Sequence, residues 1–104
     1  MSNWNLSDNV NEAFEFEIRG LRYTMRYPRT EELEQAQQLN TDLSVAQDEK
    51  RTDDVKAISG KLEDFLYDFI TPLGHETTIK AALAKENIKV MRNFNNMIKT
   101  EISL

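Results

Sequence analysis

Residues 14–27, Phe-Glu-Phe-Glu-Ile-Arg-Gly-Leu-Arg-Tyr-Thr-Met-Arg-Tyr, decide the fold of this chain. Apolar and polar side chains alternate on both sides of Arg19-Gly20, a pattern typical of two half-buried strands joined by a short loop. A two-residue loop places Phe16 opposite Tyr23, gives the hairpin one apolar face and sets opposite charges across from each other on the other face. Because Arg19 is poorly suited to the type I′ turn that this register needs, a slightly longer loop is the alternative.

Helical periodicity follows the hairpin. Pro28 ends the second strand, and Thr30 followed by Glu31 and Glu32 provides an N-cap hydroxyl and an acidic first turn. Apolar residues then recur at spacings of three and four, and helices are expected over about 30–47, 53–70, 78–86 and 87–102. Residues 47–54 carry no apolar side chain, so we expect a turn there, with one continuous helix as the alternative.

The predicted fold class is therefore α+β, with an N-terminal β-hairpin packed on a small bundle of three to four α-helices. A chain of 104 residues has the size of one domain. We assign residues 13–104 to a single α+β domain and residues 1–12, which are polar and rich in Asn, to a flexible N-terminal arm. Trp4 in this arm either packs on the core of the domain or binds a partner.

Composition and charge exclude several classes of function. The formal net charge of −5 disfavours binding to a phosphate backbone, so we expect no nucleic-acid partner. The chain has no Cys and one His, His75, which excludes disulfides, thiolate chemistry and multi-histidine metal centres. No apolar run is long enough to span a bilayer and no signal peptide is evident, so we expect no membrane association and a cytoplasmic location.

The sequence contains no phosphate-binding loop, nucleophile elbow, zinc-protease motif or EF-hand loop. Paired carboxylates such as Asp53 and Asp54 lie at expected helix starts, where they are typical of capping. His75 beside Glu76 has no marked nucleophile near it and is interpreted as a loop residue bonded to its neighbours. We therefore expect a protein that is not an enzyme, with no catalytic residue, no cofactor and no metal site.

The remaining features favour binding to other proteins. A two-stranded hairpin leaves strand edges to which another strand can add. The last helix has too many apolar residues for one narrow stripe, which suggests two contact surfaces, one of them outside the domain. The predicted partner-binding residues are Trp4, Met91, Phe94, Met97 and Ile98. Self-association is left open.

Two segments resemble a known family. Residues 14–33, a strand, short turn, strand, Pro and acidic helix start, resemble the opening of small phage tail assembly chaperones. Residues 62–73, Leu-Glu-Asp-Phe-Leu-Tyr-Asp-Phe-Ile-Thr-Pro-Leu, and the helix at residues 87–98 are similar to the closing half of the same proteins. The resemblance implies a non-enzymatic helper that binds the tape measure protein, keeps its hydrophobic helices soluble and recruits tail tube subunits during tail assembly.

Two other functions are compatible with the residues. An acidic protein of this size is also suited to act as an inhibitor or decoy that occupies a basic groove on a host protein. An enzyme would require a closed pocket that holds His75 beside a carboxylate with a strongly perturbed pKa.

Overall fold

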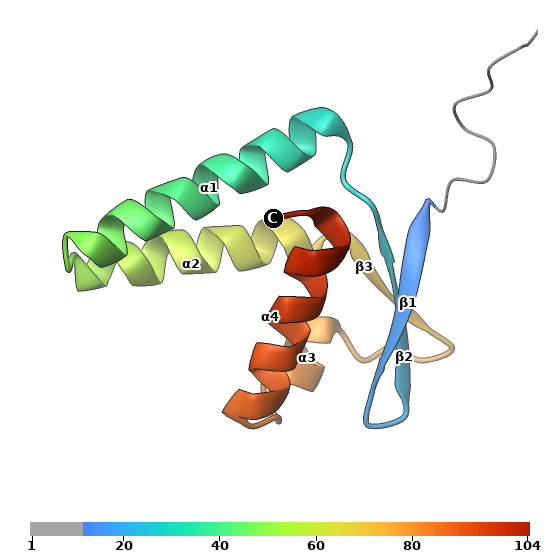
Figure 1. The fold of residues 1–104 in the computed structure, drawn as a ribbon. Helices are drawn as coiled ribbons and strands as arrows, with labels where there is room; N and C mark the ends of the chain where they lie inside the picture. The colour runs from blue at the N-terminus through green and yellow to red at the C-terminus, as the bar shows by residue number, and fades with distance from the viewer. Residues whose placement is uncertain (1–11) are drawn as a thin grey trace, which may run out of the picture.

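A computed structural model describes residues 12–104 of the protein, so most of the predicted arm, including Trp4, lies outside the described residues. The described part is an α+β fold, as predicted, in which all of the helices lie on one side of a small antiparallel sheet (Figure 1). The elements are β1 (Ala13–Ile18), β2 (Leu21–Arg26), α1 (Thr30–Asp48), α2 (Thr52–Tyr67), β3 (Ile70–Leu73), α3 (Ile79–Leu83) and α4 (Ile88–Ile102).

The predicted hairpin register is confirmed. Phe16 lies opposite Tyr23 and Glu17 opposite Arg22, as the alternation of residues 14–27 requires. The loop has two residues, both in the left-handed region, with φ values of 51° for Arg19 and 83° for Gly20. The longer loop that we considered is therefore not needed, although Arg19 adopts a conformation that non-glycine residues rarely occupy.

The sheet has a third strand that the sequence analysis did not predict. The helix expected over 53–70 ends at Tyr67, and β3 pairs antiparallel with β2, with Tyr23 opposite Pro72. Pro72 is tolerated because β3 is an edge strand, where a missing N–H need not interrupt the ladder. The expectation that both edges of the hairpin are open was wrong, since β3 covers the outer edge of β2.

The turn predicted between the first two helices is confirmed, and α1 and α2 form a helical hairpin that extends away from the sheet (Figure 1). The N-cap positions are Arg29 for α1 and Arg51 for α2, so the predicted cap Thr30 is instead the first residue of α1. Asn87 caps the last helix, because its Oδ1 accepts hydrogen bonds from two backbone N–H groups of the first turn of α4. The helix expected over 78–86 is shorter and covers five residues.

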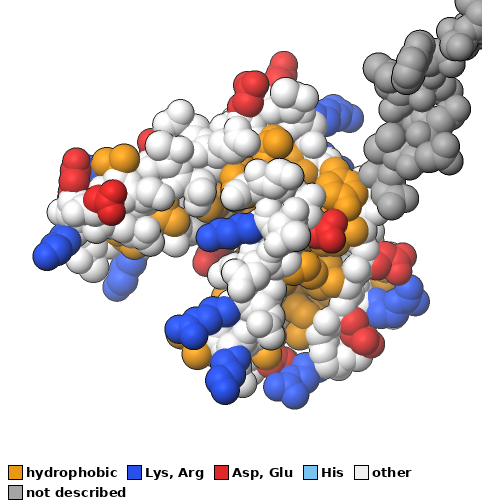
Figure 2. Space-filling model, viewed as in Figure 1, with side chains coloured by type: hydrophobic (Ala, Val, Ile, Leu, Met, Phe, Trp, Pro, Cys, Tyr) orange, Lys and Arg blue, Asp and Glu red, His pale blue; other side chains and the backbone are white. Residues whose placement is uncertain are grey.

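The core lies between the sheet, α2, α3 and α4. Tyr23 and Met25 of the central strand are fully buried, which is the consequence of having a strand on each side of β2 and helices over its apolar face. Phe94 of α4 connects two parts of this core, with its ring centroid 5.7 Å from that of Phe16 and 5.8 Å from that of Tyr67. Figure 2 shows hydrophobic side chains gathered between α4 and the sheet.

Candidate protein-binding surfaces

The predicted partner-binding residues do not form one exposed patch. Phe94 and Ile98 are 4% and 3% exposed, because α4 uses them to pack on the sheet and on α2. Most of each side chain is therefore packed inside the domain, although Phe94 and Ile98 each line one of the two hollows described below. Met91 and Met97 are half-buried at the margin of the core, and Trp4 lies outside the described residues.

An open apolar groove lies between β1 and α4, with a volume of about 290 Å³. Phe16 and Ile18 line it from the strand. Val90, Phe94 and Met97 line it from α4, where their spacing of three to four residues places them on one helix face. Phe16, Val90 and Met97 are half-buried, so the groove presents apolar side chains that are partly accessible to solvent.

The outer edge of β1 runs along this groove. Within residues 12–104 the strand order is β1-β2-β3, so no other strand pairs with that edge. The N–H of Tyr27 donates to the carbonyl oxygen of Glu12 at 3.0 Å, whereas the N–H of Arg26 donates toward β3, to the carbonyl oxygen of Phe69 at 3.1 Å. In an antiparallel pair, the main-chain N–H and C=O groups of successive residues point alternately toward and away from the partner strand. Those of Ala13, Glu15 and Glu17 therefore point away from β2, toward the outer edge of the sheet.

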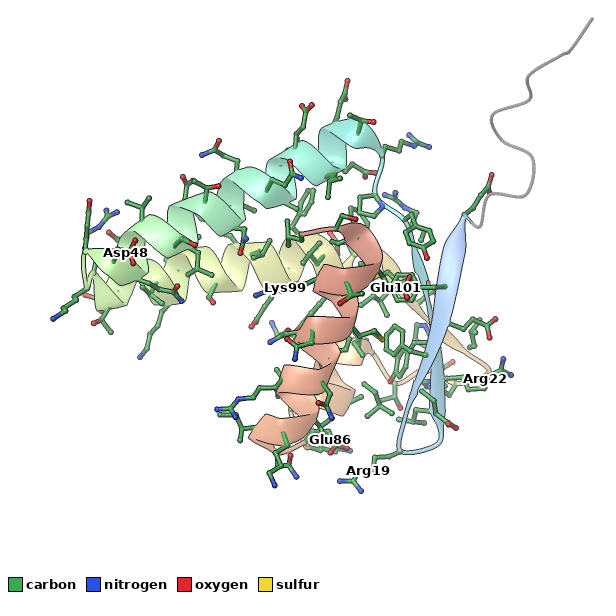
Figure 3. The ribbon with its side chains drawn as sticks, in the orientation of Figure 1. Arg19, Arg22, Asp48, Glu86, Lys99 and Glu101 are labelled. Atoms are coloured by element: carbon green, nitrogen blue, oxygen red, sulfur yellow. The ribbon has the colours of Figure 1, made fainter. Side chains whose placement is uncertain are left out.

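Two ion pairs near the groove engage the arginines of the β1–β2 hairpin that lie closest to it. Arg19, in the hairpin loop, donates to the carboxylate of Glu86 at 3.1 Å, and Figure 3 shows the two residues where the loop meets the segment before α4. Glu15 accepts a hydrogen bond from Arg22 at 2.8 Å on the exposed face of the sheet. Among the described residues none forms an ion pair with Glu17, which also lines the groove. The edge of β1 therefore carries negative charge.

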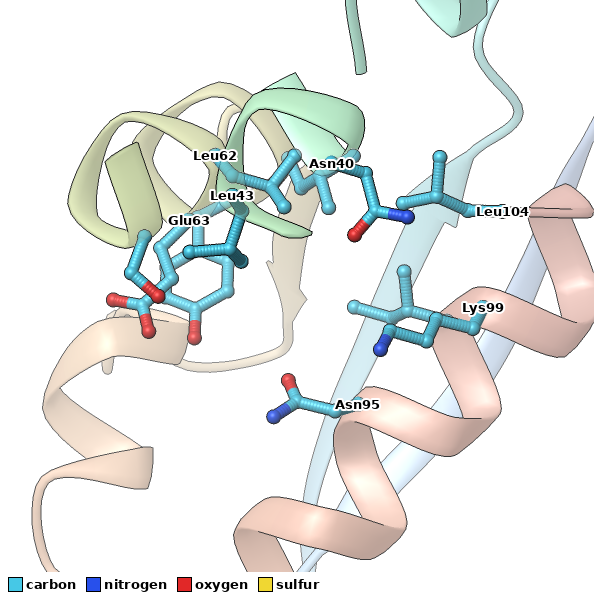
Figure 4. A pocket seen from close by; sticks show the side chains of 11 residues that line it. Asn40, Leu43, Leu62, Glu63, Asn95, Lys99 and Leu104 are labelled. Atoms are coloured by element: carbon cyan, nitrogen blue, oxygen red, sulfur yellow. The ribbon is translucent and has the colours of Figure 1, made fainter. Parts of the chain in front are cut away.

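A second hollow lies on the opposite side of α4, in the corner between this helix and the α1–α2 hairpin (Figure 4). Its floor is apolar, formed by Leu43, Leu62, Leu66, Ile98 and Leu104. Asn40 and Asn95 lie at its rim, one on each side. The volume of about 120 Å³ lies below the roughly 300–1,000 Å³ of small-molecule sites. It matches a single side chain, since a dry cavity of about 150 Å³ holds a benzene ring. We call this hollow the corner cleft.

His75 has a structural environment. Its Nδ1 accepts a hydrogen bond from the N–H of Thr77 at 3.1 Å, so Nε2 carries the hydrogen and donates to the carbonyl oxygen of Arg22 at 2.9 Å. The ring packs edge-on against Tyr23, whose hydroxyl donates to the carbonyl oxygen of Thr77. Both ring nitrogens are thus bonded to the main chain, in agreement with the interpretation of His75 as a loop residue bonded to its neighbours.

Two groups have strongly shifted pKa values, and neither is next to His75. Hydrogen bonds from Arg26 and from the N–H of Arg29 lower the pKa of Glu32 to about 2. Burial, together with the negative charges of Glu63 and Asp64, raises the pKa of Tyr67 to about 12. The pair of a histidine and a perturbed carboxylate that an enzyme hypothesis would require is therefore not assembled around His75 in the described part of the chain.

Residues 12–104 contain no cluster of three or more metal-ligating side chains. None of the helices in this range has the length and apolar character needed to cross a bilayer. No family model, no curated protein and no solved structure matches the chain.

The groove and the corner cleft were missed by the sequence analysis, because each is formed by residues that are distant in the chain. The pairing of opposite charges on the outer face of the hairpin was visible in the sequence. It could have indicated that Glu17 stays at the surface.

Proposed function

We propose that this protein acts as a tail assembly chaperone, a non-enzymatic helper that binds the tape measure protein and recruits tail tube subunits. The resemblance of residues 14–33 and 62–98 to this family supports the assignment. The observation that carries it is the corner cleft, an apolar hollow in which Leu43 and Leu104 remain partly exposed beside a rim of neutral and charged polar groups. Such a cleft is suited to take one apolar side chain from an amphipathic helix.

The tape measure protein is a suitable partner because its long helices present repeated apolar residues to solvent before the tail tube surrounds them. An apolar side chain that enters the corner cleft would be removed from water, and burial of that area lowers the free energy of the complex. Several copies of the protein, each holding one such residue, would keep a long helix soluble. This action requires neither a cofactor nor a reactive group.

Two asparagines on α4 provide a matched test. Asn95 lies at the rim of the corner cleft, whereas Asn96 is exposed and lines neither the cleft nor the groove. Co-expression with the tape measure protein of the same phage is expected to raise the soluble fraction of that partner. Asn95→Arg should fill the mouth of the cleft and weaken binding by about tenfold or more, as does loss of one well-packed interface contact. Asn96→Arg should bind like the wild type.

Several outcomes would contradict the proposal. One is a tape measure protein that is no more soluble with the chaperone than without it. Another is equal loss of binding in Asn95→Arg and Asn96→Arg, which would show that added charge, and not the cleft, is responsible. Circular dichroism and thermal unfolding of both variants would confirm that each is folded.

The decoy function has one observation in its favour. Acidic residues outnumber basic residues along the α1–α2 hairpin, and most of their side chains are exposed. Occupation of a basic groove by this hairpin would be electrostatic, so its affinity would fall steeply between low and moderate ionic strength. Capture of an apolar side chain in the corner cleft would change little over the same range. A salt titration of the complex therefore separates the two functions.

A further inference from the structure

We infer that the outer edge of β1 is a docking site for an extended segment of a partner protein in which apolar and basic residues alternate. The segment would add to the sheet as a fourth strand. Its apolar side chains would enter the groove between β1 and α4, and its basic side chains would lie opposite Glu15 and Glu17 on the other face. This inference does not depend on the tape measure protein being the partner, because it concerns a different side of α4 from the corner cleft.

Within the described part of the chain, the outer edge of β1 has main-chain groups that are free to pair with another strand. Ala13, Glu15 and Glu17 direct their N–H and C=O groups away from β2, since the residues between them form the hydrogen-bonded pairs of the hairpin. Exposed groups of this kind in a regular strand are a template for a further strand. The other edge of the sheet is less suitable, because β3 has four residues and includes Pro72, which has no N–H to donate.

The side chains of the groove offer an apolar surface to one face of an added strand. A strand paired with β1 would place every second side chain on the same face as Phe16. That face is continued by Val90 and Met97 of α4, which are half-buried and border the groove. Apolar residues at those positions of the added strand would bury the exposed parts of these side chains, and a methionine at such a site adapts to differently shaped partners.

The acidic side chains of β1 favour a basic partner. The alternate side chains of an added strand would lie on the solvent-exposed face, beside Glu15 and Glu17. The nearby positive charges are already engaged, Arg19 with Glu86 and Arg22 with Glu15. Glu17 forms no ion pair among the described residues, so lysine or arginine beside it would gain an acidic partner, whereas glutamate or aspartate would be repelled.

The same charges disfavour a second copy of β1 as the occupant. A two-fold axis centred on Glu15 would place this residue opposite its own copy. An axis centred on Phe16 would place Glu15 opposite Glu17 of the other copy. Like charges directly opposite each other destabilise strand pairing. Like charges thus disfavour both of these self-paired registers, whereas a basic strand meets no such repulsion.

The test uses the full chain and short synthetic peptides with a fluorescent label, measured by anisotropy. The probe alternates valine and lysine. One control has the same composition with the lysines in a block, and another alternates valine and glutamate. A third control is the probe with methyl groups on alternate backbone nitrogens, which keeps every side chain but cannot complete the ladder. We expect the affinity of each control peptide to be at least about tenfold lower than that of the probe.

Matched variants of the protein test the same site. Glu17→Lys should weaken binding of the probe by about fivefold and strengthen binding of the valine–glutamate peptide. Glu34→Lys makes the same change on an exposed position of α1 and should leave both affinities unchanged. Asn93→Arg should obstruct the groove that Asn93 lines, whereas Asn96→Arg should not.

Hydrogen exchange gives the result that would identify another occupant. Binding of the probe should slow exchange of the Ala13, Glu15 and Glu17 amides. Slow exchange of these amides in the peptide-free monomer would mean that the chain itself covers the edge. Slow exchange only in a self-associated form would assign the edge to a second copy. Either result would overturn the inference, as would equal binding of the probe and its N-methylated form.

Discussion

The region around the sheet and the α1–α2 hairpin use different means to hold their elements together. Around the sheet, large side chains such as Tyr23 and Met25 are fully buried. Along α1 the buried residues are Ala36 and Ala46, while Val45 near the far end is 43% exposed. Alanines let α1 and α2 approach closely but remove little apolar area from water. Stability is therefore concentrated near the sheet.

This contrast also explains where the binding surfaces lie. The corner cleft and the groove flank α4, which belongs to the well-packed region. A partner would thus contact a rigid surface of α4, either in the corner cleft beside the α1–α2 hairpin or in the groove beside the edge of β1. Rigid elements keep contact residues in place and lower the entropic cost of binding.

The largest expected effect is that of Tyr23→Ala. The substitution removes a fully buried ring that stacks on Phe16 at 5.5 Å between ring centroids, together with a hydroxyl that donates to Thr77. We expect a loss of about 3–5 kcal/mol in the free energy of unfolding, measured by urea denaturation. Val55→Ala in the α1–α2 hairpin shortens a half-buried side chain and should lower the free energy of unfolding by about 1 kcal/mol or less. Equal losses would refute the proposed difference between the two regions.

His75→Phe should have an intermediate effect. Phenylalanine keeps a ring against Tyr23 but removes the acceptor for the N–H of Thr77 and a donor to the carbonyl oxygen of Arg22. We expect a loss of about 0.5–1.5 kcal/mol in the free energy of unfolding, the net value of a typical hydrogen bond, because the bond to Arg22 is exposed and water can replace it. Glu76→Ala changes an exposed neighbour and serves as the control. A stable His75→Phe protein would show that packing, and not hydrogen bonding, is what His75 contributes.

The hairpin register could be predicted from residues 14–27 because both partners of each pair lie within one short segment. The third strand could not be predicted in this way, because its pairing with β2 joins residues that are distant in the sequence, such as Tyr23 and Pro72. One local signal was available. A residue that precedes proline avoids helical backbone, so Thr71 indicated an extended conformation at the point where the predicted helix ran to residue 70.

The candidate surfaces were less predictable than the fold. The apolar excess of α4 was evident, but periodicity gives the faces of a helix and not what covers them. Phe94 and Ile98 proved to be core residues, since α4 is packed between the sheet and α2. Only the spatial arrangement shows that Asn93 and Asn95 border two different hollows.

The smallest expected effect concerns Glu32, which links the two regions. Its carboxylate accepts hydrogen bonds from both terminal nitrogens of Arg26 on β2, at 2.8 and 2.7 Å, and from the N–H of Arg29 at 2.9 Å. The guanidinium of Arg26 also lies 4.2 Å from the centre of the Phe69 ring. These bonds stabilise the start of α1 against the sheet.

Because these bonds lower the pKa of Glu32 to about 2, its carboxylate stays ionised in the folded protein at a pH where the unfolded chain binds a proton. The stabilisation is complete above pH 4.5, the ordinary value, and is lost as the pH falls toward 2. Glu32→Gln should therefore lower the urea midpoint slightly at neutral pH, and the difference from wild type should shrink on acidification. Glu31→Gln, a carboxylate-to-amide change in the same helical turn, is the control for loss of an acidic side chain there. A constant difference between wild type and Glu32→Gln down to pH 2 would mean that the link to β2 depends on the shape of the side chain and not on its charge.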